Sequence, residues 1–247
     1  TATIAFTGSK TVGLLIQNNA AVVQPGQINV KRCIIEMGGK NAMIVDNDAD
    51  LDEAVDAALY SAVGFSGQKC SAASRLIILE EVFEKFTHRL IEAARSIECS
   101  AADNPAGYYG PVIDQDAYDR LQNEIQKNSE KHNLLYQANV PTNGYYIPLC
   151  IFSNVQAHDD IAKNEFFGPI IALIKVKNLD EAIDAANSTE YALTAGIFSR
   201  SPAHIEKAKH MLEAGNIYIN RGITGAMVDR HPFGGYKMSG IGSKTGG

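Results

Sequence analysis

The 247-residue sequence contains no tryptophan, only four cysteines and no strongly basic segment. The cysteines never reach C-x-x-C spacing and the histidines form no H-x-x-x-H pair. This predicts reduced thiols, no metal site and a cytoplasmic compartment. Lys and Arg total 22 against 28 Asp and Glu, which argues against a nucleic-acid partner. No apolar run approaches the about 18 to 20 residues that a membrane span needs.

Apolar residues make up 45 % of the chain and charged residues 20 %, close to the averages for globular proteins. Strand and helix patterns alternate along the sequence, which predicts an α/β fold with a mostly parallel sheet. The helix after residue 50 has Asp48 or Asp50 as a suitable N-cap. The other predicted helices span 10–19, 82–94, 118–125, 179–186 and 203–212. The predicted strands span 2–6, 32–36, 42–45, 75–79, 145–152, 170–176, 194–198 and 216–220.

Gly8 and Ser9 stand between the first strand and the first helix, with Gly13 early in that helix. A glycine and a hydroxyl at such a junction leave backbone N–H groups to meet a phosphate, helped by the helix dipole. The segment lacks both the G-x-G-x-x-G of a dinucleotide fold and the G-K-[ST] of a triphosphate loop. A phosphate site and a plain turn therefore both remain open from these residues alone.

Cys70 lies among polar neighbours, Gly67-Gln68-Lys69 before it and Ser71 after it. A small buried residue is the ordinary role of a free cysteine. Here the polar surroundings and the adjacent Lys69 instead predict a reactive thiol with a lowered pKa. Cys33 and Cys150 lie in apolar strand patterns, which predicts that they are packing residues.

Two carboxylates occupy unusual positions. Glu36 ends a strand directly before Met37-Gly38-Gly39-Lys40, so it is either a catalytic base or a solvated loop charge. Glu165 precedes Phe166-Phe167-Gly168-Pro169, where it either holds a ribose diol or faces water.

In order, these motifs resemble the aldehyde dehydrogenase superfamily, and Pro232-Phe233-Gly234-Gly235 completes the match. The resemblance implies an aldehyde-dehydrogenase-like catalytic domain with a mostly parallel sheet, plus remnants of a dinucleotide-binding domain. The expected parts are residues 1–37 from the NAD-binding domain, residues 38–219 as the catalytic domain, and residues 220–247 as a substrate-anchor loop and glycine-rich tail. We expect this tail not to be helical.

The resemblance also implies the roles of single residues. Cys70 would be the nucleophile that attacks the aldehyde carbon, and Glu36 the base that activates water to hydrolyse the thioester. The residues implied at the NAD cofactor are Gly8, Ser9, Gly13, Glu165 and Phe167.

Within the superfamily, the residues around Cys70 and the segment 220–226 most resemble the 1-pyrroline-5-carboxylate dehydrogenases, which oxidise glutamate 5-semialdehyde to glutamate in proline catabolism. The implied anchors of the substrate carboxylate are Ser71, Thr224, Gly225 and Ala226, and a small-residue loop suits a carboxylate. Phe233 would line the aliphatic part of the substrate. Phe65 has an ordinary role as core packing after a helix.

The family's first dinucleotide-binding strands and its oxyanion-hole asparagine precede the phosphate motif, at which this sequence starts. We therefore expect the chain to be an inactive fragment, with NAD against NADP undecided. The resemblance implies a homo-oligomeric parent and leaves open a fusion to a proline-oxidising domain. A dehydrogenase of another aldehyde and a non-catalytic relative are the alternatives. A cysteine hydrolase is disfavoured because no histidine lies beside Cys70 in the sequence.

Overall fold

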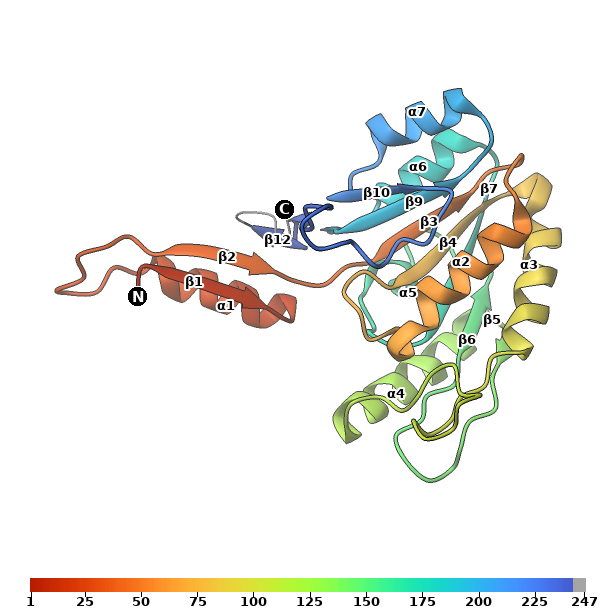
Figure 1. Ribbon diagram of the computed structural model, residues 1–247, viewed down its shortest axis with the longest axis horizontal. Helices are drawn as coiled ribbons and strands as arrows, with labels where there is room; N and C mark the ends of the chain where they lie inside the picture. Colours follow the sequence, from red (N-terminus) through yellow and green to blue (C-terminus); the bar gives the residue numbers. More distant parts are fainter. Residues whose placement is uncertain (242–247) are drawn as a thin grey trace.

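The computed structural model describes residues 1–241, in which an N-terminal arm projects from a larger α/β body (Figure 1). The arm contains β1 (Thr3–Thr7), α1 (Lys10–Ala21) and β2 (Arg32–Glu36). β1 and β2 pair in parallel, as a strand–helix–strand unit does. β12 (Gly240–Ile241) pairs antiparallel with β2, so the C-terminal segment returns from the body to the arm.

The body is built on a seven-stranded sheet of order β10-β9-β3-β4-β7-β6-β5. Neighbouring strands pair in parallel except at the edge, where β5 runs antiparallel to β6. The strands are β3 (Asn41–Val45), β4 (Ala73–Leu79), β5 (Asn133–Gln137), β6 (Cys150–Ser153), β7 (Ile170–Val176), β9 (Thr194–Phe198) and β10 (Asn216–Ile219). The α/β fold with a mostly parallel sheet is thereby confirmed.

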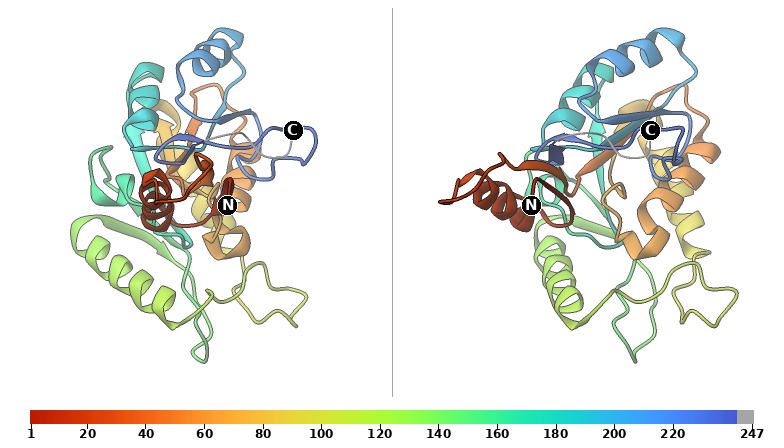
Figure 2. Two further views of the ribbon diagram at one scale, coloured as in Figure 1. Left: turned by 90° about the vertical axis from the view of Figure 1, so that its left-hand side faces the viewer. Right: turned by 60° about the vertical axis from the view of Figure 1, so that its left-hand side comes forward.

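Helices cover both faces of this sheet, which explains why β3 and β9 are buried along their whole length. α2 (Leu51–Val63) and α3 (Glu80–Arg95) lie on one face, and α6 (Leu179–Asn187) lies on the other (Figure 2). The remaining helices are α4 (Gln115–Lys131), α5 (Asp160–Lys163) and α7 (Pro202–Met211). None of these helices, within the described part of the chain, has the length and apolar character of a membrane span.

Of the two predicted N-caps of α2, Asp50 caps the helix, because its carboxylate accepts hydrogen bonds from the N–H groups of Asp52 and Glu53. Asp48 instead accepts from the hydroxyl of Ser199, 3.0 Å away. Asp48 and Asp50 thus both accept hydrogen bonds near the carboxyl end of β3, but only Asp50 caps α2.

The structure differs from the predicted elements at the far edge of the sheet. The predicted strand 145–152 is shorter, because β6 begins at Cys150 after Pro148. β5 was not predicted, since its alternately exposed residues follow α4 directly. β8 (Tyr191–Ala192) and β11 (Tyr236–Lys237) form a small antiparallel ribbon. The expectation for the tail beyond residue 241 lies outside the described residues.

Candidate active site

Cys70 follows a tight turn, η1 (Gly64–Gly67), between α2 and β4. Three successive residues of this turn, Phe65, Ser66 and Gly67, have positive φ angles. That conformation is strained for the two non-glycine residues, so surrounding contacts must hold it. The Ser66 hydroxyl donates to the Gly110 carbonyl at 2.8 Å, and Gly67 packs so closely on the backbone of Gly168 that a Cβ would not fit. The turn that presents Cys70 is thus fixed from two sides.

Phe65 is not a core residue, contrary to its expected packing role, because its side chain is 75 % exposed. The ammonium of Lys69 lies 4.6 Å from the centre of the Phe65 ring. A cation over a ring face is attracted by the ring quadrupole. The ammonium of Lys69, which was expected to lower the pKa of the Cys70 thiol, therefore lies over the ring of Phe65 instead.

The pKa of the Cys70 thiol is raised, and the predicted lowering is wrong. Burial is the largest cause, and the carboxylates of Glu165 and Glu36 raise the pKa further. The backbone N–H groups of Ser71 and of Cys70 itself oppose this effect by hydrogen bonding. The thiol is consequently protonated at neutral pH and must lose its proton before it can act as a nucleophile.

A cavity of about 430 Å³ opens beside the thiol and brings together four of the predicted site residues. Its lining consists of Gln68, Lys69, Cys70, Ser71, Ala226, Val228, His231 and Phe233. Residues more than 150 positions apart in the sequence therefore share one chamber with the thiol. Three other predicted site residues, Glu36, Thr224 and Gly225, are not among the residues that line this cavity.

The predicted substrate loop is nevertheless anchored next to this cavity. The Ser61 hydroxyl on α2 accepts a hydrogen bond from the Ile223 N–H at 3.1 Å. The following residue, Thr224, is buried, and its hydroxyl has no hydrogen-bond partner among the described residues. Gly225 then adopts a φ of 78°, which glycine allows without strain. A buried hydroxyl left in this state is suited to a ligand that supplies the missing partner.

Glu36 is 8 % exposed, so it is not the solvated loop charge of the alternative interpretation. Its own carbonyl accepts a hydrogen bond from the Gly8 N–H at 3.0 Å, and the next N–H, that of Met37, donates to Ser239 at 2.8 Å. The carboxylate lies close to Gly240 on β12. The base candidate is thus held where the arm joins the body.

Glu165 does not simply face water either. Its Oε1 accepts a hydrogen bond from the Gly39 N–H at 2.9 Å, and a Cβ on Gly38 would collide with its carboxylate. Burial raises the pKa of Glu165, while the Gly39 N–H and the ammonium of Lys40 oppose the increase. Lys40 is itself buried, and this lowers its pKa to about 7. Phe167 is partly exposed nearby, and it lines one small hole with Glu165 and Lys40.

Lys69 lines both this hole and the cavity beside the thiol. The loop that carries Cys70 therefore separates a chamber with Ser71 and Phe233 from a cluster with Glu165 and Phe167. This two-sided arrangement suits a nucleophile that receives a substrate from one side and a cofactor from the other.

The predicted phosphate segment has three features that the sequence did not predict. The Gly8 N–H is occupied by the carbonyl of Glu36, so it is not left for a phosphate. Ser9 caps α1 by accepting from the Val12 N–H at 3.4 Å. Gly13 packs against the Met37 side chain, where a larger residue would separate α1 from β2. Of the three, Ser9 at the helix N-terminus remains the direct phosphate contact we propose.

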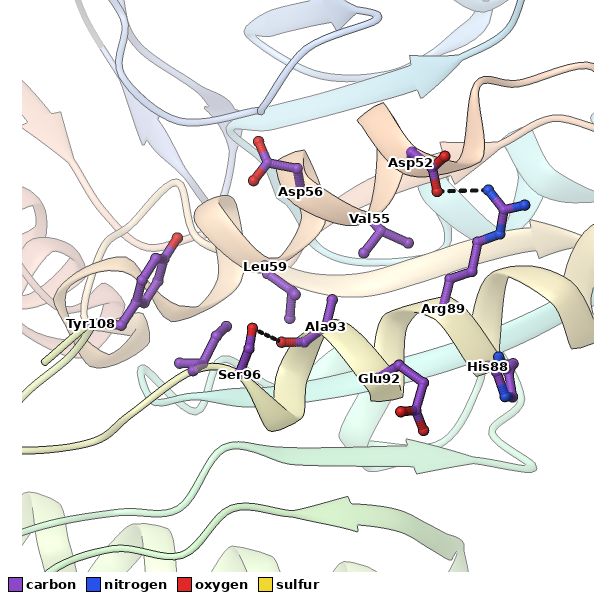
Figure 3. Close-up of a pocket in the computed structure, with 11 residues that line it drawn as sticks. Asp52, Val55, Asp56, Leu59, His88, Arg89, Glu92, Ala93, Ser96 and Tyr108 are labelled. Carbon is purple, nitrogen blue, oxygen red and sulfur yellow. Dashed lines mark hydrogen bonds and ion pairs between the residues drawn. The ribbon is translucent and has the colours of Figure 1, made fainter. Parts of the chain in front are cut away.

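A larger hollow, of about 540 Å³, lies between α2 and α3 (Figure 3). An ion pair between Arg89 and Asp52, 2.6 Å long, crosses one end of it. None of the predicted site residues lines this hollow. Although this hollow is larger than the cavity beside Cys70, its lining residues give no reason to regard it as the reactive site.

Sequence reasoning missed His231, which lines the cavity with Cys70 although 161 positions separate them. Its place directly before the Pro232-Phe233 motif could have indicated it. The His231 Nδ1 accepts a hydrogen bond from the Met227 N–H at 3.0 Å, which requires a lone pair there and assigns the proton of the neutral ring to Nε2. Among the described residues no group of three His, Cys, Asp or Glu side chains could hold a metal ion.

Comparison with known proteins decides the family. The aldehyde dehydrogenase family pattern matches residues 1–247. The chain belongs to the aldehyde dehydrogenase family. A 1-pyrroline-5-carboxylate dehydrogenase of Geobacillus thermodenitrificans is 44 % identical over 99 % of this chain and 48 % of the relative. The chain thus spans about half the length of the curated relatives that it matches.

Solved aldehyde dehydrogenase structures share this fold closely. A Thermus 1-pyrroline-5-carboxylate dehydrogenase with bound NAD has a TM-score of 0.96 and 40 % identity, covering 99 % of this chain and 48 % of its own. Proline utilization A (PutA) from Bdellovibrio bacteriovorus has a TM-score of 0.99 and 65 % identity, covering all of this chain and 26 % of its own. The aldehyde dehydrogenase motifs found in the sequence are therefore accompanied by the fold of that family.

Proposed function

We propose that this chain carries the catalytic residues of an NAD-dependent dehydrogenase that oxidises glutamate 5-semialdehyde to glutamate. The cavity that joins Cys70 to Ser71, Ala226 and Phe233 supports this proposal, because the Cys70 thiol lies there beside polar and aromatic side chains. The names of the relatives, 1-pyrroline-5-carboxylate dehydrogenases, support the same substrate.

In the proposed reaction the Cys70 sulfur forms a bond to the aldehyde carbon while the thiol proton passes to the aldehyde oxygen, which gives a thiohemiacetal. The carbon then loses a hydride and the hydroxyl loses its proton to solvent, so that the carbon becomes the acyl carbon of a thioester. NAD, when bound, supplies the acceptor of this hydride. Glu36 accepts a proton from the water that attacks the thioester, which releases glutamate and the thiol.

The residues present fit NAD on the side of the loop away from the substrate cavity. Ser9 and the N-terminus of α1 form the phosphate end, since a helix N-terminus favours anions. The Glu165 carboxylate, held by the Gly39 N–H, offers acceptors for a ribose diol, and Phe167 is 41 % exposed, which leaves its ring available to a ligand. The Thermus relative, with NAD bound, supports this cofactor.

The carboxylate of the substrate is assigned to the loop of Thr224, Gly225 and Ala226, together with Ser71. The Thr224 hydroxyl is buried without a partner, and a carboxylate would satisfy it. The 65 % identity to PutA further supports a parent protein that also carries a proline-oxidising domain. Such a parent would produce and consume the semialdehyde in one chain.

Selectivity tests the substrate assignment. The protein to use is a chimera that joins this chain to the unmatched half of the Geobacillus thermodenitrificans relative. We expect its kcat/KM for glutamate 5-semialdehyde to exceed that for an uncharged aldehyde of similar length by at least ~10-fold, because the uncharged aldehyde leaves buried donors unpaired. Formation of NADH measures both rates.

Two variants sharpen this test. Thr224→Val keeps the shape of the side chain and removes its hydroxyl, so it should lower kcat/KM for the semialdehyde and leave the uncharged aldehyde unaffected. Thr87→Val is the matched control, because Thr87 is also buried with an unpartnered hydroxyl but lies on α3. Equal kcat/KM for the two aldehydes in the unmodified chimera would contradict the carboxylate assignment.

A further inference from the structure

Asn41 is 2 % exposed and lies at the start of β3, directly after the glycine pair and Lys40. Its side-chain Nδ2 donates to the carbonyl of Cys70 at 2.8 Å and to the carbonyl of Ala72 at 2.9 Å. Its Oδ1 accepts from the backbone N–H of Thr194 at 3.0 Å. One buried amide thus connects the loop of the nucleophile to β3 and β9.

These partners fix the orientation of the amide. Two carbonyl oxygens can be satisfied only by the NH₂ group, and the Thr194 N–H can be satisfied only by the oxygen. A flipped amide would place its oxygen against two carbonyls. The hydroxyl of Thr194 also donates to the Ser71 carbonyl at 3.5 Å, so three consecutive carbonyls of the loop accept hydrogen bonds from Asn41 or Thr194.

The strand register provides an independent sign of this role. The pairing of β3 with β4 shifts between Asn41 and Ala42, so one residue of β4 is skipped there. Irregularities of this kind often re-aim a side chain next to a functional site. Here the side chain of Asn41 supplies bonds to the backbone just before β4.

The Cys70 carbonyl and the Ser71 N–H are the two ends of one planar peptide unit, and in a trans peptide they point in opposite directions. Holding the carbonyl therefore fixes the direction of the N–H. The Ser71 N–H is also the strongest of the groups that favour the ionised form of the Cys70 thiol. A hydrogen bond to the carbonyl end polarises the peptide and strengthens the N–H as a donor.

We propose that Asn41 is a positioning residue, which grips the Cys70 carbonyl and thereby aims the Ser71 N–H at the nucleophilic sulfur. This inference rests on the proposed role of Cys70. The need for such a donor follows from the charges around the thiol, because Glu165 and Glu36 both oppose a thiolate and the Lys69 ammonium lies over Phe65. Among the described residues that line the cavity, the one other titratable side chain is that of His231.

The test is the pH dependence of Cys70 alkylation in the 247-residue chain. Cys33 is replaced by serine, and the rate at which iodoacetamide labels the Cys70 peptide is followed by mass spectrometry. Asn41→Leu removes both donors without adding charge and keeps the volume similar. We expect the midpoint of its rate profile to move up by about one pH unit, with alkylation ~10-fold slower below the midpoint.

Asn128→Leu is the matched control. Asn128 is 4 % exposed, and its amide donates to the Glu124 carbonyl at 2.8 Å, but both residues lie on α4. We expect it to lower the temperature of unfolding and to leave the alkylation midpoint in place. If Asn41 served folding alone, Asn41→Leu would likewise lower the temperature of unfolding and leave the alkylation midpoint unchanged. An unchanged midpoint in a folded Asn41→Leu chain therefore overturns the proposal.

If the Asn41→Leu chain does not fold, Asn41→Ser tests the proposal instead, because the shorter side chain keeps one hydroxyl that can donate to one of the two carbonyls. An upward shift smaller than one pH unit supports the proposal, and an unchanged midpoint overturns it. Alkylation needs neither aldehyde nor NAD. An inactive chimera would therefore count against the proposed function, whereas a normal alkylation profile in these variants counts against the role of Asn41.

Discussion

The Cys70→Ala variant of the chimera is expected to lose at least ~10³-fold of its turnover with glutamate 5-semialdehyde, since removal of a covalent nucleophile usually has an effect of this order. The other cysteines offer no substitute. Cys99 and Cys150 are buried away from the cavity, and Cys33 lies on β2 of the arm. The NADH absorbance assay measures the loss.

Cys33→Ala is the control for this experiment. Cys33 is only partly buried in the arm, so we expect a loss of stability rather than of turnover. A Cys70→Ala chimera that retains more than about a tenth of the turnover would contradict the assignment of the nucleophile.

The isolated 247-residue chain is expected to form no NADH and to bind NAD weakly, although Cys70 and Glu36 are both present. The chain spans about half of its relatives, and within residues 1–241 the arm contains β1, α1, β2 and the short β12. The resemblance also implies that an asparagine of the oxyanion hole lies outside this sequence, and the loss of one such donor typically costs roughly 10² to 10³ in rate.

Calorimetric titration with NAD and the NADH assay test this expectation together. Each factor of ten in affinity corresponds to about 1.4 kcal/mol, so the loss of several cofactor contacts should take binding well beyond the micromolar range. The chimera, measured in parallel, is the positive control. Micromolar binding with turnover by the isolated chain would contradict the expectation.

The sequence allowed much of the substrate side to be predicted. Cys70, Ser71, Ala226 and Phe233 do line one cavity. Cys70 and Ser71 lie just before β4, whereas Ala226 and Phe233 lie on the loop after β10, and it was the match of all the motifs in order that linked these two segments. The alternating strand and helix patterns predicted the sheet itself, but not which ends of its strands form the cavity.

The electrostatics of the thiol could not be predicted in the same way. The lowered pKa was inferred from the adjacent Lys69, but the side chain of that residue turns to Phe65. The carboxylate with the larger effect belongs to Glu165, 95 positions away, which the Gly39 N–H holds near the loop. Neighbours in sequence therefore gave the wrong sign, because packing selected different neighbours in space.

The roles of Asn41 and His231 also depend on long-range packing. Asn41 follows a glycine-rich motif and looks like the first residue of an ordinary buried strand. Only the approach of the Cys70 loop and β9 gives its amide three partners. His231 likewise meets the cavity only because the loop after β10 returns to it.

The most direct test of the account is to trap the thioester. In a Glu36→Gln chimera mixed with NAD and glutamate 5-semialdehyde, the first hydride transfer should proceed while hydrolysis stops. Mass spectrometry should then find a γ-glutamyl group on the peptide that contains Cys70, with one NADH formed per site in a single burst. Steady NADH formation without an adduct on Cys70, or an adduct on another residue, would contradict the account.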